Sequence, residues 1–205
     1  MRILGIDPGS RLLGYGCIDQ IGNQIRHVTH GTLRLTQNPS SSALDERLLE
    51  IFKGLSSVIE EYQPQIMSIE RVFFAKNAVS ALKLGQARGA AILTGKIHNL
   101  RVVEYSPTEV KQAVVGYGRA DKQQVAKMIQ LLVGAEHFET FDASDALALA
   151  MCHVQMNRFH AESSVKSSLH QQLSSMMSAS KKCSKRSLSD LVEMQASRKI
   201  RQKLK

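Results

Sequence analysis

The chain has 205 residues, of which 43% are hydrophobic, and a formal net charge of +9. This length accommodates one domain with an appendage, and no run approaches the roughly 18 to 20 apolar residues that cross a bilayer, which excludes a membrane-spanning protein. The three cysteines lack Cys-x-x-Cys or Cys/His spacing, which argues against a disulfide framework or structural zinc and favours a reducing, cytoplasmic environment.

The N-terminal part of the chain predicts three strands in succession. Arg2 to Asp7 is an apolar run that begins almost at the N-terminus, so we expect no signal peptide. Gly22-Asn23 is typical of a tight hairpin, and it separates strands predicted around Gly14 to Ile21 and Gln24 to Leu35.

After a loop at Pro39 to Ser42, helical and extended segments alternate, and Ser42 is a candidate helix cap. The predicted elements are a helix over 44–59 with a stop at Pro64, a strand over 65–70, a helix over 77–97, a strand over 101–105, and helices over 107–115, 122–133 and 142–158.

Three consecutive strands followed by alternating strands and helices predict an α/β fold, in which helices flank a mixed five-stranded sheet. We place one domain at residues 1–158. The Ser-, Lys- and Arg-rich segment 159–205 is predicted to be a mobile or partly helical tail.

The positive charge is concentrated at the C-terminal end. Residues 158–205 contain 11 Lys or Arg against three Asp or Glu, whereas residues 1–157 contain 16 basic and 15 acidic residues. A basic protein often binds nucleic acid or another anionic surface. Here that inference depends mainly on the tail.

Four acidic residues stand at the ends of predicted elements. Asp7 and Glu70 close strands, and Asp142 and Asp145 open a helix. The last two are three positions apart, so they share one face of that helix. Together the four predict a site for divalent metal ions.

Two-metal phosphodiester hydrolysis needs carboxylates that hold two divalent ions about 4 Å apart, one to activate water and one to stabilise the leaving 3′ oxygen. Hard oxygen ligands suit Mg²⁺. Without cations, two carboxylates about 5 Å apart repel by roughly 3 kcal/mol at an effective dielectric near 20. The predicted cluster is therefore reasonable only with cations bound.

Each acid also has a structural interpretation when it is considered alone. Asp7 can form a turn, Glu70 can be a surface acid beside Arg71, and acids such as Asp142 and Asp145 stabilise the first turn of a helix. The metal-site hypothesis depends on all four occurring together.

The segment DPGSRLLGYG allows a second interpretation. A strand, a glycine turn and a return strand also bind phosphates through backbone N–H groups in actin-like sugar kinases and ATPases. The chain is short for an actin-like kinase, which needs two such domains, and it lacks a second Gly-rich phosphate loop. A phosphotransferase is the weaker alternative.

Four blocks of the sequence are distinctive when they occur together, in this order, within residues 1–158: IDPGSRLLGYG, IERVFFAKNAVSALKLGQARGA, VKQAVVGYGRADKQQV and DASDALALA. They closely resemble the RuvC family of Holliday junction resolvases. The resemblance implies an RNase H-like fold, a homodimer and Mg²⁺-dependent paired nicking of four-way DNA junctions in recombination and repair. It also implies 5′-phosphate and 3′-hydroxyl products, and work alongside the RuvA–RuvB branch-migration complex.

The resemblance assigns roles to single residues. Asp7, Glu70, Asp142 and Asp145 correspond to the catalytic set that binds two Mg²⁺ ions, which Mn²⁺ can replace, with Asp7 bridging the two. Lys111 and Lys122 correspond to lysines near the scissile phosphate, where cations offset developing negative charge. The structural alternative for both lysines is a solvated helix face.

The same resemblance suggests DNA contacts. Phe73 corresponds to an aromatic that stacks near the junction crossover, and such stacking contributes roughly 1–3 kcal/mol per base. Phe74 competes for this role, and ordinary core packing is the alternative for either residue. Weaker candidates for contacts with the DNA backbone are Lys76, Lys83 and Arg88.

Two further hypotheses remain. One is an RNase H-like nuclease with a different substrate, such as an RNA–DNA hybrid or a flap. The other is a junction-binding protein without catalysis, although the presence of all four acids argues against it. The tail lies outside the matching blocks, and it can add nonspecific DNA affinity, dock a partner or do neither.

Overall fold

The computed structural model describes residues 1–9, 11–35, 44–71, 78–135, 138 and 140–159. The predicted helix cap at Ser42 and the predicted DNA contacts Phe73 and Lys76 lie outside these residues. The chain divides into two compact units, residues 1–157 and 158–205, and the description below concerns the first. No described helix is both long enough and apolar enough to cross a membrane.

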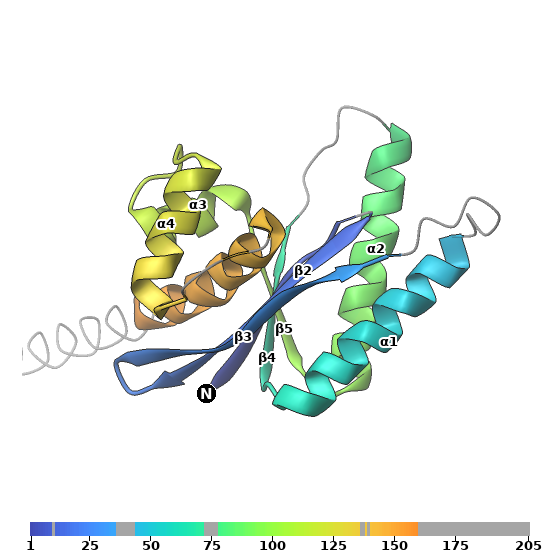
Figure 1. Cartoon of the computed structure of the whole chain (residues 1–205), viewed down its shortest axis with the longest axis horizontal. Helices are drawn as coiled ribbons and strands as arrows, with labels where there is room; N and C mark the ends of the chain where they lie inside the picture. Colours follow the sequence, from blue (N-terminus) through green and yellow to red (C-terminus); the bar gives the residue numbers. More distant parts are fainter. Residues whose placement is uncertain (10, 36–43, 72–77, 136–137, 139, 160–205) are drawn as a thin grey trace, which may run out of the picture. The chain divides into compact units, whose positions relative to one another are not determined.

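A mixed five-stranded sheet forms the centre of the first unit (Figure 1). Its order is β3-β2-β1-β4-β5, with β1 antiparallel to β2 and parallel to β4, and with β4 parallel to β5. The strands are β1 (Arg2–Asp7), β2 (Leu12–Ile21), β3 (Gln24–Arg34), β4 (Ile66–Glu70) and β5 (Arg101–Tyr105). The predicted mixed five-stranded α/β sheet is confirmed.

The hairpin between β2 and β3 turns at Gly22, whose φ of 59° is a left-handed conformation that glycine adopts without strain. The ladder continues to the pair Leu12 and Arg34, so β2 begins two residues before the predicted Gly14. Pairing with a neighbouring strand extends β2 beyond its own local pattern.

Helices cover both faces of this sheet (Figure 1). The helix α1 (Leu44–Tyr62) and the helix α2 (Ala78–Ile97) pack on one face. The other face is covered by α3 (Pro107–Val115), α4 (Lys122–Val133) and a helix over residues 141–159.

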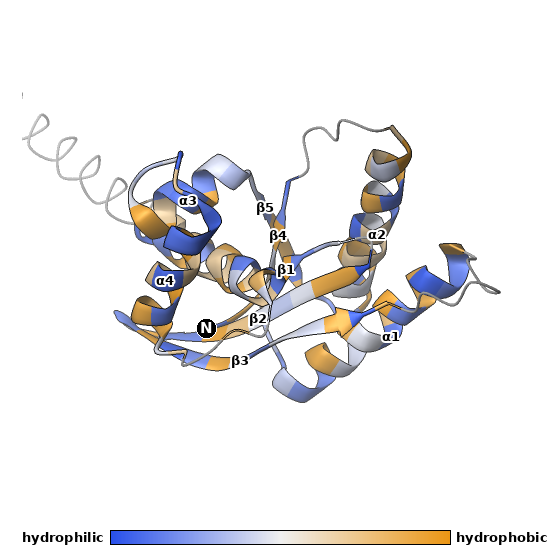
Figure 2. Ribbon diagram, turned by 45° about the horizontal axis from the view of Figure 1, so that its top comes forward, coloured by the Kyte–Doolittle hydropathy of each residue, from blue (hydrophilic) through white to orange (hydrophobic). Residues whose placement is uncertain are grey.

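Alternation along the strands divides the buried residues into two cores. In β1, Leu4 and Ile6 pack in the α1/α2 core, whereas Ile3 packs in the core under α3, α4 and helix 141–159. In β4, Met67 and Ile69 belong to the α1/α2 core. Figure 2 shows the hydrophobic colouring of the central strands, which both helix layers bury.

Candidate active site

Strand geometry brings Asp7 and Glu70 together. Ile6 is the partner of Ile69 in the parallel ladder of β1 and β4, so the residues that end these strands lie at the same edge of the sheet. Side chains alternate between faces along a strand, which puts Asp7 on the same face as Ile3 and puts Glu70 on the face opposite Ile69. Both acids therefore face the side that α3, α4 and helix 141–159 cover.

Glycines in β1 and β2 let helix 141–159 lie directly on the sheet. A Cβ atom added at Gly5 would be 1.8 Å from the carbonyl oxygen of Ala146, and one added at Gly14 would be 2.1 Å from that of Asp142. No larger residue fits there without moving the helix. The helix that carries Asp142 and Asp145 thus reaches the end of β1 because Gly5 and Gly14 have no side chains.

This packing also explains the glycine pattern that permitted a phosphate-loop interpretation. A Cβ atom at Gly16 would lie 2.6 Å from Cγ of Leu147, so helix 141–159 also fills the space where a side chain at position 16 would lie. Ser68 also connects β4 to this helix, because its buried hydroxyl donates to the carbonyl oxygen of Leu149 at 2.8 Å. Sequence reasoning did not assign roles to Gly5 and Ser68, although small residues inside buried strands are a signal of close approach.

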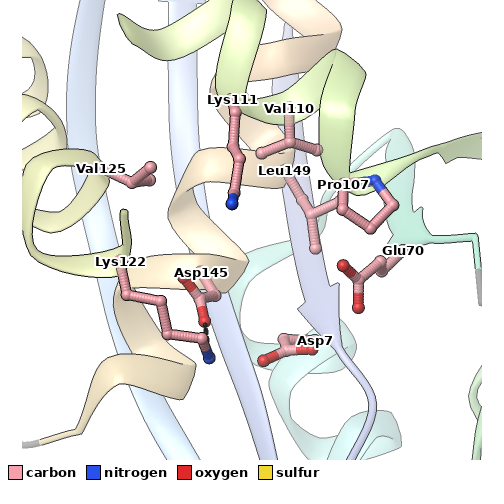
Figure 3. A pocket seen from close by; sticks show the side chains of 9 residues that line it. All are labelled: Asp7, Glu70, Pro107, Val110, Lys111, Lys122, Val125, Asp145 and Leu149. Carbon is pink, nitrogen blue, oxygen red and sulfur yellow. Dashed lines mark hydrogen bonds and ion pairs between the residues drawn. The ribbon is translucent and has the colours of Figure 1, made fainter. Parts of the chain in front are cut away.

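The resulting acidic pocket is shown in Figure 3. Asp7 lies between Glu70 and Asp145 in this view, and the ammonium groups of Lys111 and Lys122 point toward the same space. The complete lining consists of Asp7, Glu70, Pro107, Val110, Lys111, Lys122, Val125, Asp145 and Leu149. Five of the six predicted catalytic residues therefore share one pocket, with apolar walls from α3, α4 and helix 141–159.

Asp142 is the exception, because it does not line the pocket. The helix begins at residue 141, so Asp142 lies in its first turn, half-buried and three positions before Asp145. Its charge still acts on the site, since it helps to raise the pKa of Asp7 and of Lys122.

Negative charge is crowded around Asp7. Burial, together with repulsion from Glu70, Asp145 and Asp142, raises the pKa of the Asp7 carboxyl to about 7. The pKa of Glu70 is also raised, first by burial and then by Asp145, while Lys122 and Lys111 act to lower it. Both shifts indicate more buried negative charge than the protein alone neutralises.

The two lysines come from capped helices. Ser106 and Glu109 form a reciprocal capping box at the start of α3, which carries Lys111. Asp121 and Gln124 form another capping box at the start of α4, whose first residue is Lys122. These caps fix the backbone from which each lysine extends.

Lys122 and Asp145 form the direct ion pair of the site, with Nζ 3.0 Å from Oδ2. This bond is the main cause of the raised pKa of Lys122. The carboxylate of Asp145 is therefore turned toward α4 (Figure 3).

In this arrangement, no three Asp, Glu, His or Cys side chains among the described residues are grouped closely enough to hold one metal ion. The donor set nevertheless suits Mg²⁺, because the pocket presents carboxylate oxygens and no sulfur or imidazole ligand. The raised pKa of Asp7 points the same way, since a divalent cation would offset the repulsion that causes part of it. The residues fit such ions after local side-chain movement, beginning with the Asp145 carboxylate.

The two described DNA-contact candidates lie on α2 and outside the pocket. Lys83 is exposed. Arg88 is half-buried, and its guanidinium contacts the Glu70 carbonyl and the Glu104 carboxylate. The contacts that were predicted for these residues with DNA stay predictions.

Comparisons with known proteins agree with this geometry. The family model described as "Crossover junction endodeoxyribonuclease RuvC" matches residues 3–153. Proteins of that name from Geobacter sulfurreducens and Geobacter metallireducens are 56% and 55% identical over 153 residues, which is 75% of this chain and 92% of each relative. The structure of Thermus thermophilus RuvC in complex with a Holliday junction substrate superposes with a TM-score of 0.71 at 30% identity, covering 78% of this chain and 96% of that one.

Proposed function

Because this chain belongs to the RuvC family of crossover junction endodeoxyribonucleases, we propose that the acidic pocket is its nuclease active site. The chain is an endodeoxyribonuclease with an RNase H-like fold that resolves Holliday junctions. The observation that carries the site assignment is the convergence of Asp7, Glu70 and Asp145 with Lys111 and Lys122 in one pocket.

We propose that Asp7, Glu70, Asp142 and Asp145 hold two Mg²⁺ ions, which Mn²⁺ can replace. Nucleases of this family depend on metal ions. When bound in such a site, the ions activate water for attack on phosphorus and stabilise the leaving oxygen. Asp7 is the proposed shared ligand, because Glu70, Asp145 and Asp142 all act to raise the pKa of its carboxyl.

The lysines then act on the phosphodiester. Lys111 and Lys122 present positive charge to a phosphate in the pocket, where it offsets the negative charge that develops during cleavage. Lys122 must leave Asp145 to do so, and its 67% exposed side chain has the freedom to move. Val110, Val125 and Leu149 form the apolar part of the pocket lining.

A homodimer follows from the need to cut two strands. A four-way junction has two-fold symmetry, so two identical subunits place one pocket on each of two opposed strands. The helix α2 offers a suitable surface, because four apolar residues share one side of it at helical spacing. These residues are Val79, Leu82, Leu93 and Ile97, with exposed fractions of 60%, 63%, 60% and 54%.

Other parts of the family resemblance remain proposals for this chain. They include products with 5′-phosphate and 3′-hydroxyl ends, cooperation with the RuvA–RuvB complex and a cytoplasmic location. Stacking by Phe73, DNA contacts by Lys76 and Lys83, and the division into a nuclease domain at 1–158 and a tail at 159–205 have the same status.

The test uses purified protein with three substrates of matched length: a synthetic four-way junction, a linear duplex and an RNA–DNA hybrid. With Mg²⁺ we expect symmetric nicks in the junction and little cutting of the other two, and with EDTA no cutting. Equal cutting of the linear duplex would contradict junction selectivity. Preferential cutting of the hybrid would support an RNase H-like activity instead.

A further inference from the structure

The peptide that follows Glu70 is held from the α2 side of the sheet. Arg88 Nε donates to the carbonyl oxygen of Glu70 at 3.0 Å. The next amide, that of Arg71, donates to the carbonyl oxygen of Tyr105 at 2.7 Å. The two hydrogen bonds therefore hold the peptide group between Glu70 and Arg71, where β4 ends.

The other end of the Arg88 guanidinium is held as well. Its Nη2 lies 2.7 Å from Oε2 of Glu104, and Nε of Arg71 lies 3.8 Å from the same oxygen. The Arg88 side chain is 21% exposed, so it is more enclosed than a solvated lysine or arginine on a helix surface. Two protein partners thus fix its position.

Arg88 acts from the face opposite the acidic pocket. In β5, Val103 and Tyr105 pack on the pocket side and Val102 packs in the α1/α2 core. Alternation therefore puts Glu104 on the α2 side. The Glu70 carboxylate faces the pocket, while its own carbonyl is held by a helix behind the sheet.

We propose that Arg88 and Glu104 form a positioning pair that fixes the peptide after Glu70 and so aims the Glu70 carboxylate into the acidic pocket. The inference rests on the proposed function of that pocket. It gives Arg88 a role different from the DNA-backbone contact that its sequence suggested. It also links Glu70 to α2, whose apolar side we propose as the dimer interface.

The pair requires an arginine. The planar guanidinium donates from Nε and Nη2 in a fixed fork, so that one side chain reaches the Glu70 carbonyl and the Glu104 carboxylate together. A lysine has one ammonium group and can satisfy only one of them well. Loss of such an outer contact to a metal ligand typically lowers metal affinity about 10- to 100-fold.

The experiment measures Mn²⁺ binding by calorimetry on DNA-free full-length protein, together with junction affinity in EDTA. The variants are Arg88→Met, Arg88→Lys and Glu104→Gln. The control is Arg101→Gln, which removes an exposed guanidinium at the far end of β5. We expect Arg88→Met to weaken Mn²⁺ binding about 10- to 100-fold, Arg88→Lys not to restore it, and the control to match the wild type. Junction affinity in EDTA should stay within about twofold of the wild-type value for the three variants and the control.

Two results would overturn the positioning role. One is unchanged Mn²⁺ affinity in folded Arg88→Lys and Glu104→Gln. The other is weaker junction binding by the Arg88 variants with unchanged Mn²⁺ affinity, which would make Arg88 a phosphate contact. If Arg88→Met does not unfold cooperatively, the test depends on Glu104→Gln, for which we expect Mn²⁺ affinity to fall about threefold or more. Failure of the wild type to cut junctions would count instead against the proposed function.

Discussion

The ammonium group of Lys122 lies 3.0 Å from Oδ2 of Asp145, within the pocket that Asp7 and Glu70 also line. A protein cation thus neutralises part of the negative charge that metal ions would neutralise. The exposed side chain of Lys122 makes this pair easy to break. Lys122 and a metal ion at the proposed site would therefore compete for Asp145.

Replacing Lys122 by Met tests this competition. We expect tighter Mn²⁺ binding without DNA, because the competing cation is gone, and junction cleavage about 100-fold slower, because the phosphate loses a positive charge. The free energy of unfolding in EDTA should change by less than about 1 kcal/mol. Calorimetry, single-turnover cleavage and urea unfolding measure the three effects.

Lys127→Met is the matched control, since Lys127 is an exposed lysine of the same helix that does not line the pocket. It should behave as the wild type in all three assays. Weaker Mn²⁺ binding by Lys122→Met than by the control would contradict the competition.

Gly5→Ala tests how the two halves of the site are joined. The added Cβ would lie 1.8 Å from a backbone oxygen of Ala146, so helix 141–159 must move away from β1. We expect a loss of about 3 kcal/mol in the free energy of unfolding and slower cleavage, because Asp145 moves away from Asp7. Urea unfolding and single-turnover cleavage check both effects, and wild-type stability in the variant would show that the contact is looser than described.

Leu93→Glu tests the proposed dimer interface. A charge in the middle of the exposed apolar side of α2 should convert the dimer to monomer and replace paired cuts by independent single nicks. Leu131→Glu on α4 is the control, because Leu131 is 73% exposed and lies on a different helix. Sedimentation velocity measures the mass, and a plasmid cruciform distinguishes linear from nicked product. A Leu93→Glu protein that stays dimeric would exclude this interface.

We expect protonation of His153 to account for part of the stability that the protein loses at acid pH. It is buried, with ring nitrogens 2.7 Å from the Tyr105 hydroxyl and 2.9 Å from Nδ2 of Asn157. Burial, assisted by the charge of Arg101, lowers its pKa from 6.5 to about 4.

The sign of the effect follows from proton binding. Between pH 6.5 and 4 the unfolded chain binds the proton and the folded protein does not, so stability falls as the pH falls through this range. Over this whole pH range, the free energy of unfolding should fall by about 3 kcal/mol because of His153. His153→Gln should reduce this dependence in urea unfolding at pH 4.5 to 7.5, and an unchanged pH slope would contradict it.

Much of this site follows from local sequence rules. Asp7 and Glu70 end apolar strands, and a parallel pairing with alternating faces is enough to bring them together. The approach of Asp145 depends instead on Gly5, whose importance becomes visible only when Ala146 is its neighbour. The sequence around Gly5 does not show that its neighbour is Ala146, which lies 141 positions further along the chain.

The ionic contacts were harder still to predict. Nothing in the pattern shows that Asp145 turns toward Lys122, because that depends on where α4 packs. Arg88 resembled a solvated helix residue, and its partner Glu104 becomes apparent only once β5 lies beside β4. Tertiary contacts between separate elements decide both cases.

If one carboxylate pocket performs the cleavage, Asp7→Asn should abolish most of it. Asparagine keeps the size of the side chain and removes the charge that both ions would share. The measurement is single-turnover cleavage of a four-way junction in Mg²⁺ by saturating wild-type or variant protein, with junction binding measured in EDTA. We expect the variant to cleave at least about 1,000-fold more slowly and to retain junction binding. Cleavage by Asp7→Asn within tenfold of the wild type would contradict it.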